Sequence, residues 1–169
     1  DIGCGVGTFA FHACRLGAEC VGIDYSPESV KVARELCRRF QKRAQFLVAD
    51  ACHVPFPDRS FDAVVAADFI EHVTLNDKDT ILKEIKRVLK PGGTVVIYTP
   101  NGIREKIGEF YWRVRHFLFK DAVPGTDLHF GLTNKFEFHR LLRDNGFRFR
   151  LYYHDVTRPY LAWIPGIRM

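Results

Sequence analysis

Asp1-Ile2-Gly3-Cys4-Gly5-Val6-Gly7-Thr8-Phe9 is the stretch that decides the fold of this chain. Three glycines stand at every second position, after an acid and before a helical pattern. Glycine has no Cβ and tolerates positive φ, so backbone can approach a ligand closely at such a turn. The N–H groups of the following helix would then face that ligand. A dinucleotide-binding turn would have its third glycine at position 8, where this chain has Thr8.

Short apolar runs and helical patterns alternate after this glycine turn (residues 3–7). We expect strands over residues 19–24, 45–50, 63–67 and 94–99, and helices over residues 8–16, 26–42 and from Asn76 or Asp77 to about 89. In the second helix, Leu36 and Phe40 are expected to face inward. Such alternation predicts an α/β, Rossmann-like, doubly wound sheet that is mostly parallel, with right-handed crossovers.

In the second half of the chain, the regular alternation of strand and helix patterns ends. An aromatic stripe over residues 107–119 predicts a helix within a substrate-cap insertion at about 102–133. A last helix would begin at Asn134 and a last strand would cover Phe147–Tyr153. We expect a single domain over residues 1–169. Because no Met opens the chain and no apolar strand leads into the glycine turn, we also expect truncation at the N-terminus, and a similar loss at the C-terminus is considered.

Composition narrows the function classes. The 169 residues are 47% hydrophobic with a net charge of +5, which permits an anionic partner without requiring one. The five cysteines form no C-x-x-C pair, so reduced thiols and a cytoplasmic location are expected. No apolar run is long enough to span a bilayer. The basic face of the second helix is interpreted as solvated, so no nucleic acid is expected.

Acids follow the expected strands at Asp24, Asp50 and Asp68, and Asp1 opens the glycine turn. Ligands of open parallel sheets bind beyond the carboxyl ends of the strands. Asp24 lies 21 residues after Gly3, at the distance where a carboxylate meets ribose hydroxyls in dinucleotide folds. Asp50 could accept from an adenine amino group. The alternative for each acid is a helix cap or a turn former.

These motifs together resemble class I S-adenosylmethionine (SAM)-dependent methyltransferases, in the large group that includes the ubiquinone and menaquinone biosynthesis enzymes. The resemblance is carried by residues 1–7, 22–26, 48–51, 57–62 and 89–93. It implies a seven-stranded sheet, of which this chain lacks most of the first strand, and SAM as cofactor with S-adenosylhomocysteine (SAH) as product. The cofactor-binding residues that it implies are Asp1, Gly3, Cys4, Gly5, Gly7, Asp24, Tyr25, Asp50, Ala51 and Asp68.

The expected activity is methyl transfer to a small, apolar or lipid-like acceptor, at oxygen or carbon. No Asp/Asn-Pro-Pro-Tyr/Phe or Pro-Cys follows the strand at residues 63–67, which speaks against nucleobase and protein-amide acceptors. Two alternatives stay open: an NAD-dependent Rossmann oxidoreductase and a non-catalytic SAM-binding module. The acceptor and the oligomeric state are not predicted.

Candidate catalytic residues are His72, as a base or a pocket wall, and His129 in the loop before the last helix. If the chain turns helical at Asp68, then Asp68, Glu71 and His72 share one side. That pattern is similar to the Glu-x-x-Glu-His of metal-binding methyltransferase branches, although pocket-lining without metal is favoured. The aromatic stripe over 107–119 could cap the acceptor or touch a membrane surface, with core packing as the alternative.

Overall fold

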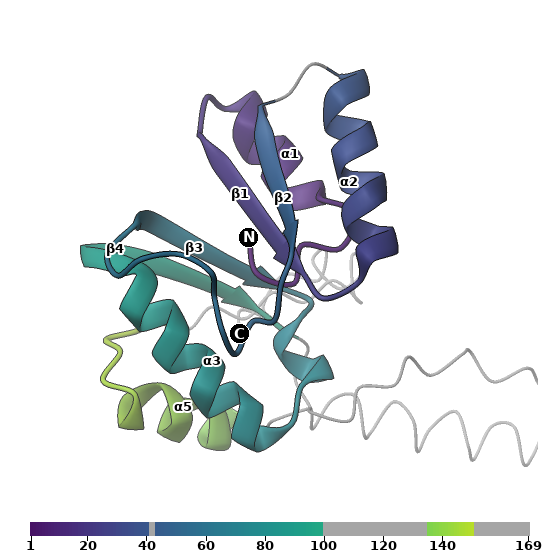
Figure 1. Cartoon of the computed structure of the whole chain (residues 1–169). Helices are drawn as coiled ribbons and strands as arrows, with labels where there is room; N and C mark the ends of the chain where they lie inside the picture. The colour runs from purple at the N-terminus through teal and green to yellow at the C-terminus, as the bar shows by residue number, and fades with distance from the viewer. Residues whose placement is uncertain (41–42, 100–134, 151–169) are drawn as a thin grey trace, which may run out of the picture.

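A computed structural model describes residues 1–40, 43–99 and 135–150. Helices and strands alternate along these ranges, as the sequence predicted (Figure 1). The elements are α1 (Thr8–Arg15), β1 (Cys20–Asp24), α2 (Pro27–Arg39), β2 (Ala44–Val48), β3 (Phe61–Ala67), the 3-10 turn η1 (Ile70–His72), α3 (Leu75–Val88), β4 (Leu89–Tyr98) and α5 (Lys135–Asp144).

All strand pairs are parallel. β1 pairs with β2, and β3 pairs with β4, so the described strands form two two-stranded sheets. Ile2 joins them: it forms a parallel bridge with Ile23 of β1, and its N–H donates to the carbonyl of Val65 in β3 over 2.8 Å. Ile2 therefore lies between the two sheets. The carboxyl ends of β1, β2, β3 and β4 therefore meet at one edge.

Two helix starts follow from their capping side chains. Ser26 caps α2, because Ser26 Oγ accepts from the Ser29 N–H over 3.2 Å and Pro27 occupies the first helical position. The expected start of α3 at Asn76 or Asp77 is wrong. Thr74 Oγ1 accepts from the Asp77 N–H over 3.3 Å, so Thr74 is the cap and the helix begins one residue later, at Leu75.

Two expectations about strands also need correction. The strand expected over residues 94–99 begins earlier, because β4 starts at Leu89 and residues 90–93 form an irregularity inside it. Phe61 pairs with Leu89 and Ala63 pairs with Thr94, so the chain between them bulges out. Gly92 takes a φ of 80°, which allows the bulge. The last strand is not formed over the described residues 147–150, while 151–153 lie outside the described ranges.

Two clusters of buried side chains hold the layers together. One lies between α3, α5 and the β3–β4 pair, and the other lies between α1, α2 and the β1–β2 pair. Figure 1 shows α3 beside the β3–β4 pair, and α1 and α2 beside the β1–β2 pair. Leu36 and Phe40, expected to be inward, are 37% and 54% exposed. Within the described ranges, no helix combines the length and apolarity needed to cross a membrane.

Candidate functional site

The three glycines of the turn all have positive φ, at 67°, 50° and 83°, but for different physical reasons. A Cβ on Gly3 would overlap the ring of Phe69 and come within 2.8 Å of its Cβ. A Cβ on Gly7 would lie 2.8 Å from the ring of Phe46. A Cβ on Gly5 would meet no atom within 4 Å. Packing therefore requires glycine at positions 3 and 7, whereas Gly5 faces open space.

Asp24 holds the glycine turn against the start of α2. Its Oδ2 accepts from the Gly5 N–H over 2.8 Å, and its Oδ1 accepts from the Ser26 N–H over 2.9 Å. Its backbone carbonyl accepts from the Ala49 N–H over 3.0 Å, which ties the ends of β1 and β2 together. A carboxylate offers about four acceptor positions, so these two side-chain bonds leave about two for a ligand.

Asp1 and Cys4, both predicted to bind the cofactor, have their polar groups engaged inside the protein. Asp1 Oδ2 accepts from the Ala10 N–H over 3.2 Å, at the first turn of α1, where Gly7 offers no capping side chain. The side chain of Cys4 is buried, at 7% exposure, and burial raises the pKa of its thiol to about 11. The nearby carboxylate of Asp24 acts in the same direction. These contacts give both side chains a structural role.

Tyr25 and Asp50 present their side chains to solvent at the same edge. Tyr25 follows β1 and is 84% exposed. The Asp50 side chain is 66% exposed, with Oδ1 accepting from the Cys52 N–H over 2.8 Å. That backbone bond is the main reason why the pKa of the Asp50 carboxyl lies below its usual range. Ala51, next to Asp50, is half-buried. An exposed ring, an ionised carboxylate and a small side chain therefore flank Gly5 and Asp24.

The geometry behind the metal hypothesis is wrong, because the chain is not helical at Asp68. Asp68 takes a left-handed φ of 48°, and helical turning begins only at η1. Asp68 and His72 are exposed, whereas Glu71 is 1% exposed and accepts from Thr99 Oγ1 over 2.9 Å. Among residues 1–40, 43–99 and 135–150, no group of three His, Cys, Asp or Glu side chains could hold a metal ion.

Two of the predictions fall on residues that the structure does not describe, and two features of the site were not predicted. His129 and the cap at about 102–133 fall outside the described residues. Phe69, which packs on Gly3, was not predicted, although an apolar residue directly after a strand-ending acid was a signal for it. The burial of Glu71 could not be predicted, because the sequence Glu71-His72 does not indicate which of the two side chains is buried.

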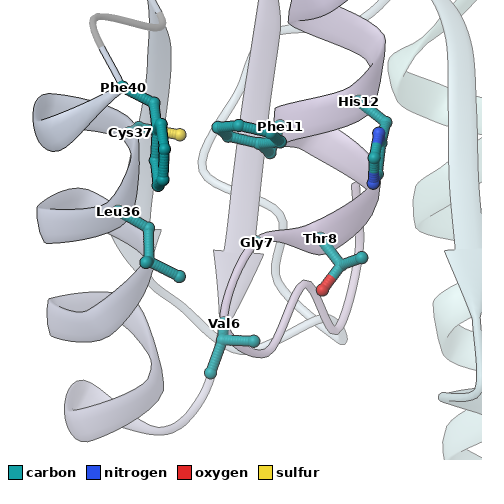
Figure 2. Close-up of a pocket in the computed structure, with 8 residues that line it drawn as sticks. All are labelled: Val6, Gly7, Thr8, Phe11, His12, Leu36, Cys37 and Phe40. Atoms are coloured by element: carbon teal, nitrogen blue, oxygen red, sulfur yellow. The ribbon is translucent and has the colours of Figure 1, made fainter.

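A groove between α1 and α2 does not form part of this edge. It has a volume of about 150 Å³, and only Gly7 among the predicted cofactor residues lines it. Figure 2 shows Phe11 of α1 facing Phe40, the C-cap of α2, across it; their ring centroids are 5.5 Å apart. Sites for ligands of drug or cofactor size usually measure about 300–1,000 Å³, so this groove is too small for a nucleoside-bearing cofactor.

Comparisons with known proteins agree with this geometry. Residues 1–97 match the family model described as a methyltransferase domain. Ajmaline N-methyltransferase of Rauvolfia serpentina is 39% identical over 100 residues, covering 57% of this chain and 34% of that protein. Chloroplastic tocopherol O-methyltransferase of Arabidopsis thaliana is 41% identical over 102 residues, covering 59% of this chain and 29% of that protein. The chain thus spans about a third of the length of these curated relatives.

A solved structure gives the same result for the fold. A SAM-dependent methyltransferase from Methanosarcina mazei superposes with a TM-score of 0.68 at 26% identity, over 86% of this chain and 76% of that chain. The predicted α/β, Rossmann-like fold and the resemblance to class I methyltransferases are both confirmed.

Proposed function

The chain belongs to the methyltransferase domain family, and from this premise we propose that it transfers a methyl group from SAM to a small, apolar or lipid-like acceptor. Oxygen or carbon is the proposed target atom, and SAH is the product. The single observation that carries the proposal is Gly5, whose backbone faces open space while its N–H is held by Asp24.

The residues around Gly5 suit the parts of SAM. The two acceptor positions left on Asp24 match the two hydroxyls of a ribose. Asp50 accepts from the Cys52 N–H and lies 3.5 Å from His53 Nδ1, and the acceptor positions that remain on its exposed carboxylate can take the adenine amino group. The exposed ring of Tyr25 offers a surface on which an adenine can stack. Asp24, Asp50 and Asp68 also make this edge negative, which favours a ligand that carries a sulfonium cation.

The bound SAM would supply an activated methyl group on a positive sulfur. Displacement at that carbon needs no covalent enzyme intermediate, so the chain contributes mainly by orienting the two reactants in line. A base is needed only for an acceptor whose hydroxyl must lose its proton. His72, exposed beside Asp68 at the sheet edge, is the proposed base or pocket wall, and the role of His129 stays a prediction.

The acceptor class is supported by what the relatives methylate. One of the relatives is a tocopherol O-methyltransferase, which fits a lipid-like acceptor and an oxygen target. Another is an ajmaline N-methyltransferase, so nitrogen is an outcome that the acceptor screen must be able to detect. The cytoplasmic location, the peripheral membrane contact and the absence of nucleic acid as a partner stay predictions.

Calorimetric titration with SAM, SAH and NAD⁺ tests the cofactor. We expect SAM and SAH to bind and NAD⁺ to give no heat; binding of NAD⁺ with SAM inert would overturn the proposal in favour of an oxidoreductase. A screen with methyl-labelled SAM over quinone, tocopherol, sterol and amine acceptors tests the reaction. A protein that binds SAM but labels none of the acceptor classes would be a SAM-binding module.

A further inference from the structure

Two charged side chains are buried where β3 gives way to α3. Glu71 of η1 is 1% exposed and Lys78 of α3 is 0% exposed. Removing a carboxylate or an ammonium from water is costly unless a partner of opposite charge or a hydrogen bond replaces the lost hydration. The buried Glu71 and Lys78 side chains therefore need polar partners at fixed positions around them.

The contacts of these two side chains connect four elements. Thr99, directly after β4, donates its hydroxyl to Glu71 Oε2 over 2.9 Å. Burial lowers the pKa of Lys78, and the carboxylates of Glu71 and then of Glu137 on α5 act against that shift by favouring the charged ammonium. The two buried side chains thus come from η1 and α3, and Thr99, directly after the end of β4, holds the first of them.

The segment that carries Glu71 also reaches the glycine turn. The Asp68 N–H donates to the carbonyl of Tyr98 over 3.0 Å, and the His72 N–H donates to the carbonyl of Phe69 over 3.0 Å. Between these bonds, the ring of Phe69 packs so closely on Gly3 that a methyl group there would overlap it. A displacement of this segment would therefore move the surface against which the glycine turn is packed.

We propose that Glu71 and Lys78 are positioning residues of the cofactor site, which fix the segment 68–72 and, through the contact of Phe69 with Gly3, set the affinity of the glycine turn for SAM. This proposal rests on the proposed function, because it assigns the cofactor site to the glycine turn. It gives the buried charges a role beyond stability: the same contacts that hold the segment also orient Asp68 and His72 at the edge.

Calorimetric titration of SAH into Glu71→Gln, Lys78→Met and the double variant tests this, with thermal unfolding measured in parallel. Each single variant removes one of the two buried charges, and we expect its dissociation constant for SAH to rise about tenfold at a temperature where it is fully folded. The double variant removes both charges, so its loss should be smaller than the product of the two single losses. Lys83→Met is the matched control, since Lys83 pairs with Asp79 on the surface of the same helix.

Thr99 supplies a milder variant if the single charge variants do not fold. Thr99→Val removes the hydroxyl that donates to Glu71, and Thr99→Ser keeps it. We expect SAH binding to weaken about threefold in the first and to stay unchanged in the second. Folded variants that bind SAH as tightly as the wild type would overturn the positioning role and leave the proposed function intact. A wild-type chain that binds neither SAM nor SAH would instead sink the proposed function.

Discussion

Replacing each glycine of the turn by alanine separates the structural requirement from the ligand requirement. At Gly5 the added methyl group meets no protein atom within 4 Å, so only the positive φ opposes it. A left-handed backbone costs an L-residue about 1–2 kcal/mol. At Gly7 the methyl group would also press on Phe46, and overpacking of this kind costs about 1–3 kcal/mol more. Gly3→Ala should cost at least as much, because the base of the Phe69 side chain cannot swing away.

Thermal unfolding followed by circular dichroism measures these differences. For a chain of this size, about 1 kcal/mol corresponds to about 2–4 °C in Tm. We expect Gly5→Ala to lower Tm by roughly 2–8 °C, and Gly3→Ala and Gly7→Ala to lower it by roughly 4–20 °C. Gly17→Ala is the matched control: Gly17 has a φ of 91° with nothing within 4 Å of its Cβ position, and it lies at the far end of α1.

SAH binding should rank the variants differently. Gly5→Ala places its methyl group where the backbone would meet the cofactor, and a clash of about 1–3 kcal/mol weakens binding roughly five- to 150-fold. Gly17→Ala carries the same backbone strain and should bind like the wild type. Wild-type affinity in folded Gly5→Ala would refute the assignment of the open space to the cofactor. A Gly3→Ala variant as stable as Gly5→Ala would refute the packing argument.

Three further outcomes follow from the contacts at the edge. Asp24→Asn leaves only one acceptor oxygen for two backbone donors, one of them Gly5, so it should lose about 1–3 kcal/mol in denaturant unfolding and bind SAH more weakly. The Arg87 guanidinium is the main reason why the pKa of the Glu84 carboxyl lies below its usual 4.5. Stability from this pair is therefore complete above pH 4.5 and declines as the pH falls through the lowered pKa. Arg87→Met should make that decline smaller in urea titrations, while the bond from the Val54 N–H to Glu84 Oε2 keeps part of it. With a pKa of about 11, roughly 0.1% of the Cys4 thiol is ionised at pH 8, so mass spectrometry should find this site slow to alkylate with iodoacetamide until the protein unfolds.

The order of elements and the glycine turn were predictable because they depend on local chemistry. Ser26 followed by Pro27 predicts a capped helix, and the structure confirms it. The same reasoning missed Thr74 as the cap of α3, because Asp77 stands where the usual capping box has Glu or Gln. The capping and turn residues in the sequence therefore predicted which helices form, but they did not give the first residue of α3 correctly.

Positions that depend on contacts far along the chain were not predictable. The helical pattern cannot show that Leu36 and Phe40 lie along a groove with Phe11 rather than in the core, since that depends on how α1 packs beside α2. The left-handed φ of Asp68 has no signal in the sequence either, and the Asp68 N–H donates to the carbonyl of Tyr98, thirty residues later. The alternative of a metal site at Asp68, Glu71 and His72 depended on a helix starting at Asp68, and the structure has a left-handed Asp68 and a buried Glu71 instead.

Asp1 and Asp24 have different roles, because the fold leaves a different number of acceptor positions unused on each carboxylate. The sequence alone does not show this number. Asp1 faces the first turn of α1 and caps it, so its carboxylate serves the helix. Asp24 satisfies two backbone donors and keeps further acceptor positions beside Gly5. Folding and ligand binding are therefore coupled at Asp24 and separable at Gly5, which contributes only a backbone N–H and the absence of a side chain.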